Sequence, residues 1–234
     1  MTNLELPFIK DMFDTIAPRY DFLNRFLSMR QDVYWRRKMV SETNLHAKAR
    51  VLDVACGTGD VAMEVIRQAG GTARVIGADF SPGMLLLAKE KIKNNNAMDQ
   101  IHLLAGNALM LPFTDECFDA VTIAFGIRNI ADKLTALKSF HTCLKKGGTL
   151  AVLELATPKE GMFRSFYLLY FRKILPLIGG FFSKNMAAYE YLPNSVLNFP
   201  QPKAFAGIMT AAGFTGVRWQ KLSLGIVTLY VGKK

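Results

Sequence analysis

A glycine-rich turn between two apolar runs constrains the fold of this chain more than any other feature. The run Val51–Val54 is typical of a buried β-strand, Gly57 and Gly59 then turn the chain, and Asp60 begins a helical pattern. A second apolar run follows that helix and ends in Asp79. Strand, glycine turn, helix and a second strand with an acid at its tip form a βαβ unit. Such a unit binds a nucleoside at the carboxyl ends of parallel strands.

The charges around this turn argue against a dinucleotide such as NAD. A pyrophosphate at a helix N-terminus requires backbone N–H groups and no nearby anion, whereas Asp53 and Asp60 flank the turn. Carboxylates there favour a ligand with a cationic end. S-adenosylmethionine carries an ammonium and a sulfonium and no phosphate, and its ribose diol requires an acceptor such as Asp79. The alternative is that Asp60 only stabilises the helix dipole, by about 0.3–1 kcal/mol.

Strands and helices continue to alternate beyond this unit. Helical patterns cover residues 81–94, 133–144 and 203–212, and strand patterns cover residues 101–105, 120–125, 149–155, 217–222 and 226–231. Lys145–Gly148 is expected as a turn. This alternation predicts an α/β fold built on a doubly wound, mainly parallel sheet.

Length, cysteine content and hydropathy narrow the class of protein. A chain of 234 residues, half of them hydrophobic, is long enough for one domain with a full core. The cysteines Cys56, Cys117 and Cys143 are odd in number and lack metal-ligand spacing, so we expect a reduced, cytoplasmic setting and no metal site. No apolar run reaches the ~18 residues of a spanning helix.

The net charge of +10 is unevenly distributed. Residues 51–156 are almost neutral, with 10 basic and 11 acidic side chains, whereas residues 201–234 carry 5 basic and no acidic ones. Residues 157–200 combine a basic excess with ten aromatic side chains. A basic periphery around a neutral core predicts contact with an anionic surface, either lipid head groups or nucleic acid. The alternative is that solubility alone accounts for the charge.

Several stretches resemble known methyltransferases. The loop Asp53–Asp60, Asp79, Asn107-Ala108 and Leu144–Gly148 resemble the class I methyltransferases that depend on S-adenosylmethionine. Four further stretches resemble the C-methyltransferases of ubiquinone and menaquinone biosynthesis, and they cover Met12–Asn24, Ala124–Asn129, Tyr189–Leu192, and Gly213-Phe214 with Gly225–Val227. The resemblance extends over nearly the whole chain.

The resemblance implies one methyltransferase domain over residues 1–234, with a seven-stranded sheet of the Rossmann-like type. Four segments are expected within it. They are an N-terminal helical lid (1–45), a cofactor-binding core (46–156), an aromatic cap insert (157–200), and a C-terminal helix with closing strands (201–234).

The same resemblance implies the site residues. The expected cofactor contacts are Asp53, Gly57, Thr58, Gly59, Asp79, Asn107 and Ala108. Among them, Asp79 would accept the ribose hydroxyls and Asn107 would lie beside the adenine.

Catalysis is assigned to Arg128, which would hold a phenolate, and to Asn129, which would orient it. Asp14 and Tyr20 are secondary candidates. The alternative for Arg128 is a structural ion pair with a carboxylate such as Asp132.

The implied reaction is carbon methylation of a polyprenylated hydroquinone, with demethylmenaquinol as the expected substrate and a benzoquinol as the alternative. A polyprenyl tail stays in the bilayer, so the basic, aromatic insert suggests peripheral docking at the inner face of the membrane; ordinary core packing of these aromatics is the alternative.

Three further function classes are weighed against this reaction. An RNA methyltransferase is a more remote possibility. Enzymes that methylate base amino groups often carry an Asn/Asp-Pro-Pro-aromatic element where this chain has Phe125–Asn129, so no nucleic-acid partner is expected. The second class is a non-catalytic regulator that binds S-adenosylmethionine. The third is an NAD oxidoreductase.

Overall fold

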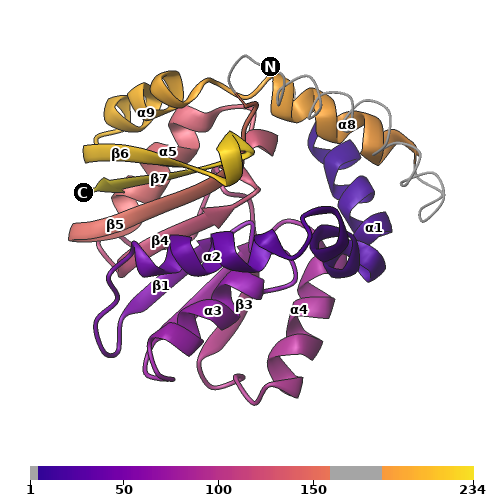
Figure 1. Cartoon of the computed structure of the whole chain (residues 1–234). Helices are drawn as coiled ribbons and strands as arrows, with labels where there is room; N and C mark the ends of the chain where they lie inside the picture. The colour runs from indigo at the N-terminus through magenta and orange to yellow at the C-terminus, as the bar shows by residue number, and fades with distance from the viewer. Residues whose placement is uncertain (1–4, 159–185) are drawn as a thin grey trace.

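A seven-stranded sheet forms the centre of the computed structural model, which describes residues 5–158 and 186–234 (Figure 1). The strand order is β3-β2-β1-β4-β5-β7-β6, and β7 runs antiparallel to both of its neighbours. The strands are β1 Arg50–Val54, β2 Arg74–Asp79, β3 Ile101–Ala105, β4 Phe118–Ala124, β5 Leu144–Leu155, β6 Thr215–Leu222 and β7 Val227–Lys233. The predicted doubly wound, mainly parallel sheet is therefore confirmed.

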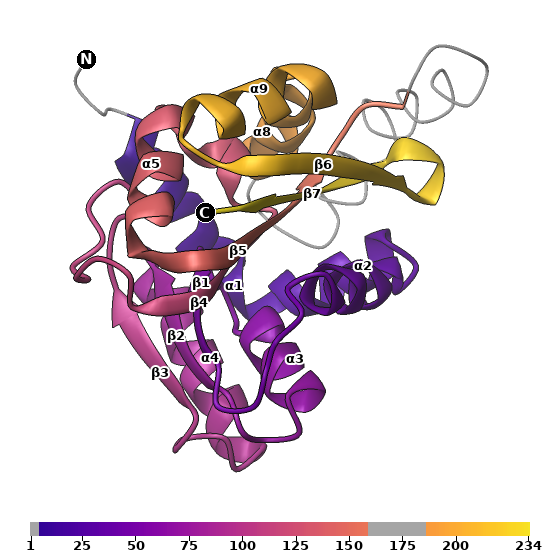
Figure 2. The same cartoon turned by 90° about the vertical axis from the view of Figure 1, so that its left-hand side faces the viewer.

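Helices cover both faces of the sheet (Figure 2). They are α1 Glu5–Leu27, α2 Gln31–Ser41, α3 Asp60–Gln68, α4 Pro82–Asn94, α5 Lys133–Cys143, α8 Met186–Leu197 and α9 Pro202–Ala211, with short 3-10 turns η1 Ile127–Asn129 and η3 Ser223–Gly225. One apolar core lies between the sheet and α2, α3 and α4, and a second lies between the sheet and α5 and α9. Because both faces are covered, successive side chains of the central strands are buried on opposite sides.

The segment expected as a turn before β5 is part of that strand. Phe118 pairs with Leu144, and the next pair joins Ala120 to Thr149, so the intervening residues form a bulge. Gly147 adopts φ +76°, a conformation that favours glycine. The bulge is stabilised by the chain terminus, because Gly147 N donates to Lys234 O at 3.0 Å and Lys234 N donates to Gly148 O at 3.0 Å.

The N-terminal helix α1 lies over the carboxyl ends of the strands. Met12 and Leu23 of α1 pack against Val196 of α8 in a third, smaller apolar cluster. Most of the aromatic side chains expected to dock on a membrane belong to residues 159–185, which lie outside the described residues. Within the described ranges, no helix has the length and hydropathy needed to cross a bilayer.

Candidate active site

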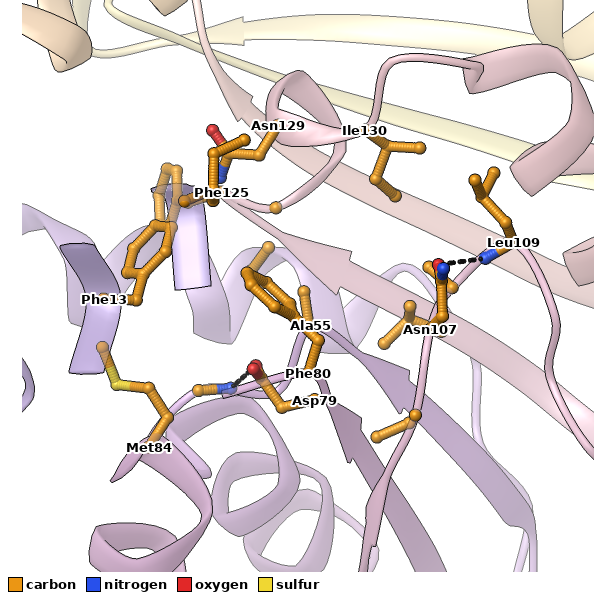
Figure 3. Close-up of a pocket in the computed structure, with 18 of the residues that line it drawn as sticks. Phe13, Ala55, Asp79, Phe80, Met84, Asn107, Leu109, Phe125, Asn129 and Ile130 are labelled. Atoms are coloured by element: carbon orange, nitrogen blue, oxygen red, sulfur yellow. Dashed lines mark hydrogen bonds between the residues drawn. The ribbon is translucent and has the colours of Figure 1, made fainter. Parts of the chain in front are cut away.

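A cavity lies at the carboxyl edge of the sheet, where the loops after β1, β2, β3 and β4 meet α1 (Figure 3). The strand order reverses direction between β1 and β4. The two loops that follow them therefore diverge to opposite faces and leave a crevice, which is where open parallel sheets bind their ligands.

Asp79 holds the glycine loop in place at one side of this cavity. Its Oδ2 atom accepts the Gly57 N–H at 2.7 Å, and its Oδ1 atom accepts the Ser81 N–H at 2.9 Å. Figure 3 shows the Asp79 carboxylate at the cavity wall with its bond to Gly57. Burial raises the pKa of Asp79, although these backbone bonds oppose the shift. The carboxylate thus orders the loop and lies where a ligand hydroxyl can reach it.

Asn107 lies on the other side of the cavity and also stabilises its own loop. Its Oδ1 atom accepts the Leu109 N–H at 3.0 Å, which closes the turn after β3. Asn107 and Ala108 both line the cavity. The structure therefore brings together Gly57, Asp79, Asn107 and Ala108 from three different loops, as the sequence predicted for a nucleoside site.

Asp53 is buried beneath the cavity and does not line it. Its side chain is on β1, where Oδ1 accepts the Thr122 hydroxyl at 2.8 Å. Its Oδ2 atom accepts no hydrogen bond from the described residues. Burial raises the pKa of Asp53 to about 7, and the Asp79 charge acts in the same direction. The positive charge of Arg36 opposes this shift in the pKa of Asp53.

Thr58 and Asp60 face α1 and α4 instead of the cavity. The Thr58 hydroxyl donates to Asp21 Oδ1 at 2.6 Å, and Lys91 Nζ lies 2.6 Å from Asp21 Oδ2 and 2.5 Å from Asp60 Oδ1. Burial acts to raise the pKa of Asp60, but the charges of Arg36 and Lys91 outweigh it and hold the pKa below its usual value. Asp60 is already neutralised by the protein, so it is not the carboxylate left over for a cationic ligand.

Gly59 also lies away from the cavity. A Cβ atom at this position would meet Ala88 of α4 at 3.5 Å, and Gly59 adopts φ +81°. Its role in the structure is the close approach of the loop to α4.

Arg128 forms a buried ion pair with Glu154 of β5. Its guanidinium nitrogen lies 2.8 Å from Glu154 Oε1, its backbone N–H donates to Oε2 at 3.0 Å, and it also donates to the Phe125 carbonyl. Glu154 is fully buried. Asp132 is not the partner, because its carboxylate caps α5 through Thr135. Arg128 Nε has no hydrogen-bond partner among the described residues, which leaves one donor of a buried cation unused.

Asn129 lines the cavity directly after Arg128. The Tyr191 hydroxyl of α8 donates to Asn129 Oδ1 at 3.1 Å. This bond orients the amide, so that its NH₂ group is the end available to donate to a ligand.

Tyr20 of α1 also lines the cavity, in contrast to Asp14. Burial raises the pKa of the Tyr20 hydroxyl, although the charges of Arg128 and Arg36 act to lower it. The phenol is therefore a neutral donor at physiological pH. Asp14 instead accepts hydrogen bonds from Ser81 Oγ and Gly83 N, which fastens α1 to the start of α4.

Apolar side chains from α1 and the β2–α4 region complete the cavity wall. In Figure 3, Phe13, Phe80 and Met84 lie on one side, and Leu109 and Ile130 lie on the other. The sequence did not single out these residues.

Glu154, the partner of Arg128, is a further residue that the sequence analysis missed. A signal for it existed, since a lone carboxylate in the apolar run of β5 requires a buried partner.

The fold is that of the class I methyltransferases that depend on S-adenosylmethionine. Two solved structures with the same fold are a putative S-adenosyl-L-methionine-dependent methyltransferase from Methanococcus maripaludis (TM-score 0.69, 15% identity, 93% of this chain and 91% of that chain) and a possible histamine N-methyltransferase from Thermotoga maritima (TM-score 0.64, 22% identity, 96% and 99%). A [4+2]-cyclase, SpnF, shares the fold with a TM-score of 0.73, 17% identity and coverage of 97% and 95%, so the fold alone does not define the reaction.

Whole-chain comparison identifies the family. The model of the ubiE/COQ5 methyltransferase family matches residues 1–234, and this chain belongs to that family. The ubiquinone/menaquinone biosynthesis C-methyltransferase UbiE of Geobacter sp. strain M21 is 47% identical over 97% of this chain and 96% of its own length. The demethylmenaquinone methyltransferase of Thermus thermophilus is 47% identical over 95% of this chain and 100% of its own. The family expected from the sequence motifs is confirmed.

Proposed function

We propose that this protein methylates a ring carbon of a polyprenylated hydroquinone, with demethylmenaquinol as the substrate. Its membership of the ubiE/COQ5 family supports this activity, and relatives at 47% identity carry the names of menaquinone and ubiquinone enzymes. The observation that carries the proposal is the cavity itself, which combines an acidic side chain, Asp79, with an apolar wall and the amide of Asn129. Arg128 is not among the lining residues, and its buried ion pair with Glu154 lies directly before Asn129 in the chain. A benzoquinol of ubiquinone biosynthesis is the second candidate, because the name of the Geobacter relative includes both ubiquinone and menaquinone biosynthesis.

The cofactor site consists of the loops on the nucleoside side of the cavity. Bound S-adenosylmethionine supplies an electrophilic methyl group. Asp79 would accept the ribose hydroxyls, Asn107 and Ala108 would contact the adenine, and Gly57 would allow close approach of the loop backbone. Asp53, which is buried outside the cavity lining and has an unpaired Oδ2 atom, would add negative charge near a cationic ligand. Thr58 and Gly59 act indirectly, by holding the loop against α1 and α4.

The hydroquinone site lies toward Tyr20, Arg128 and Asn129. An oxidised quinone ring is electron-poor and cannot act as a carbon nucleophile, so the substrate must be the reduced ring. Loss of a hydroxyl proton increases the electron density of the ring and creates a phenolate. The Arg128 cation and the Asn129 amide stabilise that phenolate, and the apolar wall excludes water, which strengthens both interactions. Alignment of two bound molecules in such a site contributes up to about 7–11 kcal/mol toward lowering the barrier.

The polyprenyl tail also determines where the enzyme works. The tail remains in the bilayer, and the basic excess outside residues 51–156 attracts anionic lipid. We therefore place the protein in the cytoplasm, in peripheral contact with the inner face of the membrane, with no metal and no nucleic acid required for its reaction.

Substitution of Arg128 tests the catalytic assignment. Arg128→Ala leaves Glu154 buried without a partner, so we expect a loss of about 3–5 kcal/mol in the free energy of unfolding. Arg128→Ala/Glu154→Gln removes that charge and should recover part of the loss. A catalytic Arg128 predicts that turnover of the reduced quinone stays roughly 10²–10³-fold below wild type in both variants. The affinity for S-adenosylmethionine should stay close to wild type in the double variant.

The same preparations discriminate between the proposed reaction and its rivals. Recovery of turnover together with stability in the double variant would assign Arg128 a structural role only. Equal turnover of the oxidised and reduced quinone under anaerobic conditions would contradict the proposed chemistry. Cofactor binding without turnover of any quinol would instead support a non-catalytic regulator.

A further inference from the structure

Two turns that are far apart in the sequence lie side by side at one corner of the molecule. The first is the turn between α1 and α2, and the second is η3 at the tip of the β6–β7 hairpin. Ser223 joins them, because it accepts the Trp35 indole N–H at 2.8 Å and donates to Gln31 Oε1 at 3.0 Å. Figure 2 shows α2 and the hairpin tip next to each other on the right.

Both turns present large apolar side chains to solvent. Met29 is 84% exposed and Leu224 is 79% exposed. Phe22 and Phe26 on the last turns of α1 are each more than half exposed and stack on one another. Exposed apolar side chains that cluster in this way mark an interaction surface more often than chance exposure does.

The backbone of both turns is held in an unfavourable conformation. Met29, Arg30 and Leu224 have φ values of 51°, 62° and 58°, although none of them is glycine. A large side chain in this region carries strain, and such positions cluster where a protein binds something. Here two of the strained residues, Met29 and Leu224, are also the exposed apolar ones.

The exposed charge at this corner is positive, although several basic side chains of residues 19–38 are paired with acids, as Arg36 is with Asp32 and Lys38 is with Glu42. Residues 19–38 contain six basic and two acidic side chains. Arg30 and Lys221 are exposed, and the Lys221 side chain lies against Gly225 of the hairpin tip. A basic rim around exposed apolar side chains complements an anionic lipid surface, in which the apolar groups enter the bilayer boundary and the cations meet the head groups.

The corner is also connected to the reaction site. Leu27 and Ile226, which flank the two turns, pack in the same apolar cluster as Phe13 of the cavity wall and Tyr191, the partner of Asn129. A partner bound at this corner would therefore contact the C-terminal end of α1, the helix that supplies Phe13 and Tyr20 to the cavity.

We propose that Met29 and Leu224, with Arg30 and Lys221 around them, form a docking surface for an anionic lipid bilayer. The inference rests on the proposed function, because a polyprenyl substrate in the bilayer requires the enzyme to bind the membrane surface. None of these four residues belongs to the 157–200 insert, on which membrane docking was expected from the sequence.

Vesicle binding by matched double variants tests this surface. Wild-type protein should sediment with vesicles of phosphatidylcholine containing anionic phosphatidylglycerol, and much less with phosphatidylcholine alone or at high salt. Met29→Ser/Leu224→Ser should weaken binding to the anionic vesicles by about tenfold or more, because two apolar anchors are lost. Leu86→Ser/Met110→Ser is the control, since these side chains are 64% and 81% exposed on other elements and lie outside the corner.

Turnover separates this proposal from the proposed function. With a short-tailed, water-soluble quinol, all three proteins should have equal activity, whereas a long-tailed quinol in vesicles should be methylated more slowly only by Met29→Ser/Leu224→Ser. Equal loss of binding in the two double variants, or no vesicle binding by wild type, would overturn the docking surface. Loss of self-association in Met29→Ser/Leu224→Ser without loss of vesicle binding would show that the corner contacts a second copy of the chain, and would also overturn it. Absence of methylation of the soluble quinol by wild type contradicts the proposed function alone.

Discussion

Asp79 combines two roles in one carboxylate at the residue scale. It accepts backbone N–H groups from the glycine loop and from the start of α4, and it faces the cavity where a ribose would bind. A glutamate or an amide would change the reach or the number of acceptors, so an aspartate satisfies both needs at once. In the proposed nucleoside site, Asp79 would therefore determine the shape of the loop as well as contact the ligand.

Asp79→Ala should weaken binding of S-adenosylmethionine by about 1.5–3 kcal/mol, the range for a lost charged hydrogen bond. The glycine loop also loses its hydrogen bond to Asp79 in this variant, which should weaken binding further. Calorimetric titration measures the affinity. Asp99→Ala, at an exposed aspartate away from the cavity, should bind the cofactor like wild type. Unchanged affinity in a folded Asp79→Ala protein would remove Asp79 from the site.

At the scale of elements, polar contacts fasten α1 across α4 and the glycine loop. Lys91 of α4 contacts Asp21 of α1, Asp60 of α3 and the Thr58 hydroxyl. Asp14 provides the second attachment through Ser81 and Gly83. Because α1 also supplies Phe13 and Tyr20 to the cavity, these contacts hold in place a helix that forms part of the cavity wall.

Lys91→Met should loosen α1 and lower the affinity for S-adenosylmethionine, since Asp21 and Asp60 lose a shared cation. Hydrogen exchange followed by mass spectrometry should show faster exchange of the α1 amides. The matched control is Lys93→Met, at an exposed lysine on the same helix. If the α1 amides exchange at the wild-type rate in Lys91→Met, the contacts of Lys91 do not hold α1 in place.

At the scale of the whole molecule, the titration of Asp53 links stability to pH. Burial raises the pKa of Asp53 to about 7 in the folded protein. The folded state therefore binds this proton more tightly than the unfolded chain does. The resulting stabilisation is complete below the unfolded pKa, near 3.8, and is lost as the pH rises through about 7.

The free energy of unfolding of each protein is compared at pH 5 and pH 8 without cofactor. The decrease from pH 5 to pH 8 should be larger in the wild type than in Asp53→Asn, by on the order of 2 kcal/mol. Urea denaturation of both proteins at the two pH values measures this difference. Asp79 titrates in both proteins, so its contribution is common to both. Parallel changes in the two proteins would show that Asp53 is already ionised at pH 5.

Local patterns predicted most of the fold because they depend on near neighbours in the chain. The apolar run before Gly57, the start of α3 at Asp60 and the end of β2 at Asp79 all lie where the sequence placed them. The turn expected at Lys145–Gly148 became a bulge because its hydrogen bonds are made with Lys234, which lies far away in the sequence. That contact has no local signal.

The sequence by itself determined the alternation of strands and helices, the nucleoside edge of the sheet and the family, since periodicity, glycine turns and motif spacing are properties of short segments. Only the tertiary structure decided which charges are paired. Arg128 meets Glu154 instead of Asp132, and Asp60 meets Lys91 instead of remaining open to a ligand. The physical reason is that strand order and helix packing bring these groups together. A buried charge takes whichever partner the packed elements place beside it.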